Sequence, residues 1–142
     1  MSLHQLNEIE CETVREKFAA YPEDILPTML FLRKTIFDVA IENDVGPVNE
    51  TLKWNEPAYL TKTGSTIRIN WEKGQYRVYF YCRSKLVATF KEIYPDTFDY
   101  HTLRAICFMD MESIKAVLPE LKHCIKLALI YHTVRHLPLL GN

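Results

Sequence analysis

The chain has 142 residues, and its 17 Lys and Arg residues nearly balance 18 Asp and Glu residues, for a formal net charge of −1. Apolar residues make up 48% and charged residues 25%, as in an ordinary soluble domain. The balanced charge argues against a general nucleic-acid binder, and the length fits one domain over residues 1–142 with its own core.

We expect neither a secretory signal nor a membrane-spanning helix in this sequence. The first residues are polar and lack the basic-then-apolar layout of a secretory signal. The longest apolar runs, at 78–82 and 127–131, are far shorter than the ~18 residues that a membrane helix needs. The cysteines form no C-x-x-C pair and sit among apolar neighbours, as reduced thiols do. We therefore expect a cytoplasmic protein with no membrane partner.

Two helices are expected in the first third of the chain. One runs from residue 8 to about residue 20, and the Tyr-Pro-Glu-Asp sequence at 21–24 breaks and restarts the chain. From Ile25 to Val39, apolar residues then recur at alternating spacings of four and three, which predicts an amphipathic helix. Residues 44–47 end it.

After residue 50 the apolar residues no longer recur with a helical period and instead alternate with polar residues. Short strands are expected at 51–54, 58–61, 66–71 and 76–82, with a break at 55–57 between the first two. Gly74 supplies the positive φ that a hairpin turn at 72–75 needs. These strands predict an antiparallel meander that is covered on one face.

The second half returns to helices with one more strand. A short helix capped by Ser84, a strand at 103–109, a helical turn after Asp110 and a last helix from 120 to about 136 are expected. Helices segregated against one antiparallel sheet of about five strands indicate an α+β fold, with N-terminal and C-terminal helices packed on the sheet. The predicted core residues are Leu32, Ile36, Ile67, Ile69, Val78, Phe80, Phe90, Cys107, Ile125 and Ala128.

The most distinctive stretch reads Leu-Lys-Trp-Asn-Glu-Pro-Ala-Tyr from residue 52. Trp54 and Tyr59 flank a proline-fixed turn that also carries Asn55 and Glu56, and small concave sites are often lined in this way. We expect the two rings to be near neighbours beside one ligand site. The structural alternative is that Trp54 caps the core and Pro57 only sets a bend.

This stretch, the helix entered through Tyr-Pro-Glu at 21–23, the later hairpins and the C-terminal helix resemble the YdhG-like family (domain of unknown function 1801). The likeness spans residues 14–135 and centres on Lys-Trp-x-x-Pro-x-Tyr. The family has Gly after the Trp, whereas Asn55 stands there in this chain, which keeps a turn but not the close backbone approach that Gly allows. The resemblance implies a small cytosolic bacterial α+β domain and, from proposals for some members, frataxin-like iron delivery.

An acidic stripe bears on the iron interpretation. Glu8, Glu12 and Glu16 are spaced four residues apart, so a continuous helix would align their carboxylates, which suit hard cations such as ferrous iron. Arg15 and Lys17 would neutralise part of the stripe. The alternative is an ordinary solvated helix face.

A second candidate surface lies on the outward side of the predicted sheet. Arginines bind carboxylate or phosphate bidentately and aromatic rings stack on planar groups, so this side would suit an anionic small molecule if no helix covers it. The alternative is an ordinary exposed face, on which the apolar parts of the Arg and Tyr side chains shield the sheet from water. The outward residues are Arg68, Asn70, Arg77, Tyr79, Tyr81 and Arg104.

Catalytic signatures such as G-x-S-x-G, H-E-x-x-H and G-x-G-x-x-G are missing from the sequence. We therefore favour a non-enzymatic domain that binds a small ligand or iron, with candidate ligand residues Trp54, Asn55, Glu56, Tyr59, Arg68, Arg77 and Tyr79. Two alternatives stay open: a small-molecule enzyme with a pocket near Glu56 and Tyr59, and an interaction module that forms a homodimer.

Overall fold

The computed structural model describes the backbone of residues 2–142 and the side chains of residues 5–142. Within that range the chain forms one antiparallel sheet with helices beside it, which confirms the α+β class. The helices are α1 (Ser2–Asn7), α2 (Glu12–Ala19), α3 (Leu26–Glu42), α4 (Leu86–Ile93), α5 (Met111–Ala116), α6 (Leu118–Leu129), α7 (Tyr131–Val134) and the 3-10 turn η1 (Pro138–Gly141). The strands are β1 (Asn49–Lys53), β2 (Glu56–Leu60), β3 (Ile67–Glu72), β4 (Gln75–Tyr79), β5 (Asp99–His101) and β6 (Ala105–Phe108).

The sheet has the strand order β1-β2-β3-β4-β6-β5, and every neighbouring pair is antiparallel. β1 to β4 form the predicted meander. The chain then passes through α4 and adds β5 at the far edge before β6 pairs with β4. The described residues thus form six strands instead of about five, because β5 is only three residues long and too short to show an alternating pattern.

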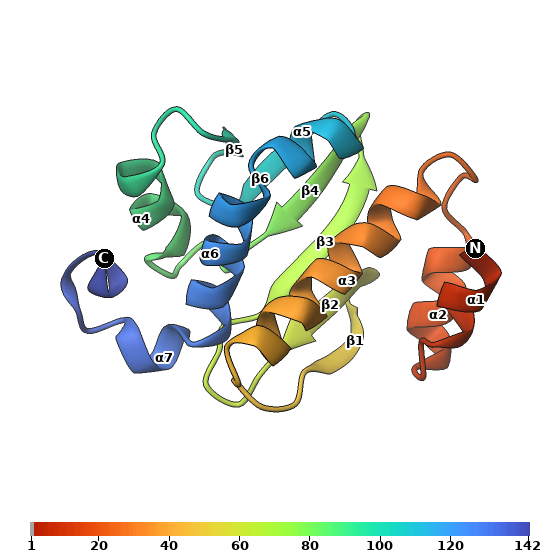
Figure 1. The fold of residues 1–142 in the computed structure, drawn as a ribbon, viewed down its shortest axis with the longest axis horizontal. Coiled ribbons are helices and arrows are strands. Elements are labelled where there is room, and N and C mark those ends of the chain that lie inside the picture. Colours follow the sequence, from red (N-terminus) through yellow and green to blue (C-terminus); the bar gives the residue numbers. More distant parts are fainter. Residues whose placement is uncertain (1) are drawn as a thin grey trace.

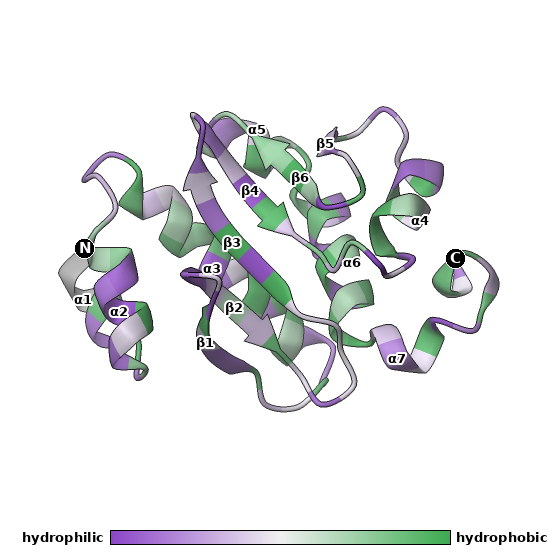
Figure 2. Cartoon of the chain, turned by 180° about the vertical axis from the view of Figure 1, so that it is seen from behind, coloured by the Kyte–Doolittle hydropathy of each residue, from purple (hydrophilic) through white to green (hydrophobic). Residues whose placement is uncertain are grey.

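The helices divide the sheet into two unlike faces. α3 and α6 lie across one face (Figure 1), whereas the opposite view shows β2, β3 and β4 with no described helix in front of them (Figure 2). On β3, Ile67 and Ile69 are fully buried, while Arg68 and Asn70, which alternate with them, are half-buried. Because side chains alternate along a strand, this pattern marks a covered face, packed on α3 and α6, and an open face.

The predicted core is confirmed. All ten residues named from the sequence are buried, and nine of them belong to the main cluster between the covered face and the helices. The tenth residue, Cys107, is buried outside this cluster: it packs with Tyr79 and Ala105 in a small cluster on the open face. Among the described residues, no helix is both long enough and apolar enough to cross a membrane.

The predicted continuous helix from residue 8 to residue 20 is wrong. α1 ends at Asn7, residues 8–11 form a turn, and α2 begins at Glu12. The turn buries Ile9 completely, and the Arg15 guanidinium donates to the Ile9 carbonyl at 2.7 Å. Burying this side chain and satisfying its carbonyl stabilises the break in the helix.

The last helix is also interrupted. α6 ends at Leu129 and α7 spans only Tyr131–Val134, although one helix was expected from residue 120 to about residue 136. The loop at 61–65 donates hydrogen bonds to the carbonyl groups at the end of α6. The Thr61 hydroxyl donates to Leu129 O at 2.6 Å, and the Ser65 amide donates to Ala128 O at 2.9 Å. The last carbonyls of a helix need such partners, and here the loop provides them.

Candidate functional site

The turn between β1 and β2 is tighter than the sequence suggested. Lys53 pairs with Glu56, so only Trp54 and Asn55 connect the strands, and their φ angles are 55° and 62°. Two-residue hairpins of type I′ need positive φ at both positions, which suits Asn but is rare for a bulky ring. Trp54 is nevertheless 85% exposed and outside the core. Such strain at an exposed aromatic residue points to a functional role.

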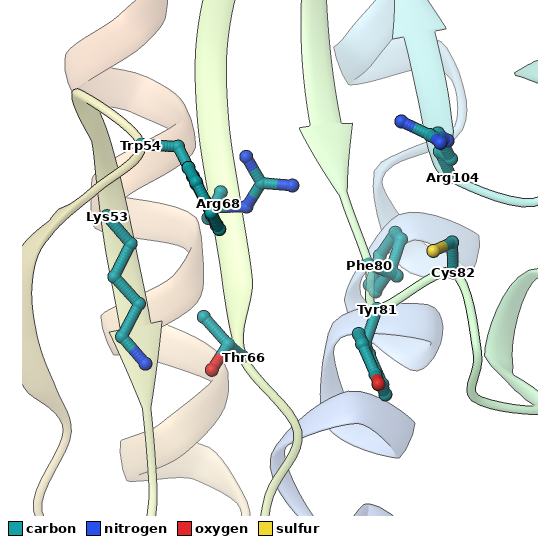
Figure 3. Close-up of a pocket in the computed structure, with 8 residues that line it drawn as sticks. All are labelled: Lys53, Trp54, Thr66, Arg68, Phe80, Tyr81, Cys82 and Arg104. Atoms are coloured by element: carbon teal, nitrogen blue, oxygen red, sulfur yellow. The ribbon is translucent and has the colours of Figure 1, made fainter.

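Trp54 stands at one side of a groove of about 530 Å³ on the open face (Figure 3). The groove opens where β3 and β4 stop pairing, beyond the last pair, Arg68 and Tyr79. Trp54 and Arg68 border it on one side, and the segment after β4 borders it on the other. The lining residues are Lys53, Trp54, Thr66, Arg68, Phe80, Tyr81, Cys82 and Arg104.

The groove is cationic. Three of its lining residues are Lys or Arg, and none of the described lining residues is acidic. Within the part of the chain that the structure describes, no ion pair or hydrogen bond engages the Lys53 ammonium or the Arg104 guanidinium. Arg68 is paired with Glu56 through Nη1 alone, at 2.5 Å, and lies over the Tyr79 ring at 5.1 Å. Cations without a carboxylate partner favour an anionic ligand.

Arg68 is the first member of a chain of hydrogen bonds that continues through Glu56 and Asn70 to Tyr21. Glu56 is buried and also accepts from Asn70 Nδ2 at 3.2 Å, while Asn70 Oδ1 accepts from the Tyr21 hydroxyl at 2.6 Å. Burial raises the pKa of the Glu56 carboxyl more than the charge of Arg68 lowers it. Glu56 does not line the groove. Glu56 therefore orients Arg68. The enzyme alternative required Glu56 to face an enclosed pocket, and it does not.

Two other predicted ligand residues lie beside the groove and not in it. The buried Arg77 donates to the Tyr79 hydroxyl at 3.2 Å and to Gln75 Oε1 at 3.0 Å, and Tyr79 donates to Glu72. Burial, followed by the hydrogen bond to Glu72, raises the pKa of Tyr79 to about 12. These groups are satisfied by one another, so this part of the open face offers few free donors.

Trp54 and Tyr59 do not share a site, contrary to expectation. The pairing of Tyr59 with Ile67 turns its ring toward the covered face, where it is fully buried with its edge on Phe37, at 5.8 Å between centroids. Its hydroxyl donates to Glu50 at 2.8 Å. The tight turn sends Trp54 to the open face instead, so the Trp and the Tyr of the motif serve different purposes.

We expect alkaline pH to destabilise the fold. Burial disfavours the phenolate and raises the pKa of five tyrosines: Tyr21, Tyr59, Tyr79, Tyr94 and Tyr100. Unfolded tyrosines ionise near pH 10, whereas these five hold their protons to higher pH in the fold. Above pH 10 the unfolded state therefore binds fewer protons, and the free energy of unfolding falls as the pH rises. Urea unfolding below and above pH 10, with phenolate absorbance, tests this, and a free energy that stays constant would contradict it.

The acidic stripe proposed for iron is not assembled. Glu8 lies in the turn before α2, whereas Glu12 and Glu16 lie on the exposed side of α2. Across the residues whose side chains are described, no group of three or more His, Cys, Asp or Glu side chains is arranged to hold a metal ion. The stripe required a helix through residues 8–11, where the chain turns.

Sequence reasoning missed part of the groove lining. Lys53, Thr66 and Cys82 were not among the candidates for ligand binding, although Tyr81 and Arg104 were identified as outward-facing. Thr66 and Cys82 were expected inside the strands at 66–71 and 76–82, but β3 begins at Ile67 and β4 ends at Tyr79. The predicted alternation therefore does not describe these two positions. A two-residue hairpin turn at 54–55 was the signal that could have placed Lys53 and Trp54 together on one side of the groove.

No family model, curated protein or solved structure matches the chain. The resemblance to the YdhG-like family stays a prediction, and the ligand of the groove has to be inferred from the residues that line it.

Proposed function

We propose that the protein is a non-enzymatic binding domain that holds a small anionic ligand with a planar ring in the groove on the open face. The observation that carries this proposal is the exposed Trp54 beside three cationic side chains in a lining without carboxylates. An indole face stacks on planar rings, and the cations neutralise the anionic group. A volume of about 530 Å³ lies within the range of small-molecule sites, roughly 300–1,000 Å³.

The chemistry of the lining favours binding over catalysis. General acid–base catalysis most often uses His, Asp or Glu within reach of the substrate. The described lining has none of these, and its Lys53, Tyr81 and Cys82 side chains have no carboxylate or imidazole beside them in the groove. All four cysteines are free, which fits the reducing cytoplasm that we propose as the protein's location.

Substitutions in the groove should separate its two binding elements. With 1-naphthyl phosphate as the probe in isothermal titration calorimetry, we expect saturable binding to one site. Trp54→Ala should weaken it about tenfold, since stacking on an aromatic ring contributes roughly 1–3 kcal/mol. Arg104→Gln should also weaken it about tenfold, through the loss of one charge-assisted contact.

Lys73→Gln is the matched control, because Lys73 is an exposed cation in the turn between β3 and β4 and does not line the groove. It should bind the probe as the parent chain does. Absence of saturable binding, or equal loss in all three variants, would refute the proposal.

The homodimer alternative makes a different prediction for the same side chain. If a second copy covers Trp54, sedimentation should show a concentration-dependent dimer that Trp54→Ala abolishes. We expect a monomer for both chains, since the proposal assigns the exposed ring to a small ligand. If the chain forms a dimer that Trp54→Ala abolishes, Trp54 belongs to a subunit interface and not to a ligand site.

A further inference from the structure

We infer that the ligand of this groove is a nucleoside monophosphate, with its base on Trp54 and its phosphate between Arg68 and Arg104. The inference rests on the proposed function and adds the chemical class of the ligand. It follows from the charge of the groove, the direction of its two guanidinium groups and the arrangement of bonds on the remainder of the open face.

The charge of the groove matches a phosphate monoester. Its three cations are offset by one neighbouring carboxylate, Glu56, which leaves a local charge of 3 − 1 = +2. A phosphate monoester carries a charge of about −1.5 to −2 at neutral pH, because its second pKa is about 6. A monocarboxylate would leave one cation uncompensated, so the groove favours the phosphate.

The two arginines are oriented to share such a group. Their guanidinium groups point toward each other across the groove (Figure 3). Arg68 uses only Nη1 for Glu56, which leaves Nε and Nη2 without a partner among the described residues. A guanidinium offers two parallel donors to phosphate oxygens, and the bond to Glu56 fixes the plane of this one before the ligand arrives.

The aromatic side chains suit a nucleobase. The exposed Trp54 ring borders the same groove as the arginines, and Tyr81, which is 53% exposed, lines the side opposite Trp54. Stacking on an aromatic ring accepts every base, because each base has a π-face. The groove is open to solvent, so the polar edge of a base can remain hydrated. A plain hydrocarbon ring would gain less from this arrangement.

The rest of the open face argues for a single nucleotide and against a strand. Arg77 is engaged with Tyr79 and Gln75, and Glu72 adds a negative charge beside them. The chain as a whole has a net charge of −1. A strand is held by successive phosphate contacts along a cationic track, and the bonds described here leave no such track beyond the groove.

Titrations with adenosine 5′-monophosphate, adenosine and ribose 5-phosphate test the inference. We expect the nucleotide to bind at least about tenfold more tightly than either fragment, because each fragment lacks one of the two binding elements. Arg104→Gln should weaken the nucleotide about tenfold and leave adenosine unchanged. Trp54→Ala should weaken the nucleotide and adenosine but not ribose 5-phosphate. Both side chains are exposed, so neither variant endangers the fold.

The outcomes distinguish this inference from the proposed function. If 1-naphthyl phosphate binds and the nucleotide binds no better than its fragments, the nucleotide class is wrong while the anionic-ligand site stands. If neither compound binds, both fail. Tighter binding of octathymidylate than of the mononucleotide, with a salt dependence of several phosphate contacts, would overturn the inference in favour of a single strand.

Discussion

Replacing Gly64 by alanine is expected to lower the free energy of unfolding by about 3 kcal/mol. Gly64 lies in the loop that docks on the end of α6, and a Cβ atom there would lie 2.6 Å from Thr61 Oγ1 and 2.8 Å from Leu129 O. The Leu129 carbonyl belongs to the helix and cannot shift without distorting it. Thr61 Oγ1 cannot move away without losing its buried hydrogen bond to the same carbonyl.

Gly74→Ala is the matched control for this substitution. Gly74 has a φ of 73° and no atom within 4 Å of an added Cβ, so alanine there bears only the cost of a left-handed backbone, about 1–2 kcal/mol. Urea unfolding of both variants, followed by circular dichroism, separates the steric effect from the conformational one. A loss for Gly64→Ala no greater than that for Gly74→Ala would mean that the loop does not pack on α6 as described.

The same loop explains why the C-terminal helix could not be predicted from local sequence. The apolar periodicity continues past Leu129, and nothing in that segment signals a stop. The helix ends because Thr61 and Thr63, which lie 68 and 66 positions earlier in the chain, donate hydrogen bonds to the Leu129 carbonyl. This long-range contact overrides local propensity. The turn at 8–11 has a similar origin, since the burial of Ile9 depends on packing that the N-terminal sequence alone does not specify.

Alternation, by contrast, is a local property, and it predicted the faces of β3 and β4 correctly. On β6 it was wrong, because Cys107 was expected in the core between sheet and helices but lies on the open face. Ile67, Ile69 and Val78 are buried on the covered face, as expected from their spacing. Alternation predicts a face but not a position on it, nor which charges are already paired. Arg68 and Arg77 therefore looked equivalent in the sequence, whereas one lines the groove and the other is bonded to Tyr79 and Gln75.

Arg33→Met is expected to lower the free energy of unfolding by about 3–5 kcal/mol, because it would leave a carboxylate buried without its cation. Arg33 donates to both oxygens of Glu50, at 2.7 and 2.9 Å, and the two side chains are only 15% and 9% exposed. The guanidinium also lies over the Phe37 ring at 4.7 Å. After the substitution, the Tyr59 hydroxyl would be the remaining described donor to Glu50.

Two further variants make this prediction specific to the buried pair. Lys34→Met removes the neighbouring cation of an exposed pair with Asp38, whose side chains are 65% and 35% exposed, and should cost less than about 1 kcal/mol. The double variant Arg33→Met, Glu50→Leu removes both charges and should recover at least about 2 kcal/mol relative to the sum of the two single losses. Equal losses for Arg33→Met and Lys34→Met would show that the buried pair contributes nothing special. Since the pair lies on the covered face, every variant that folds should still bind 1-naphthyl phosphate in the groove with parental affinity.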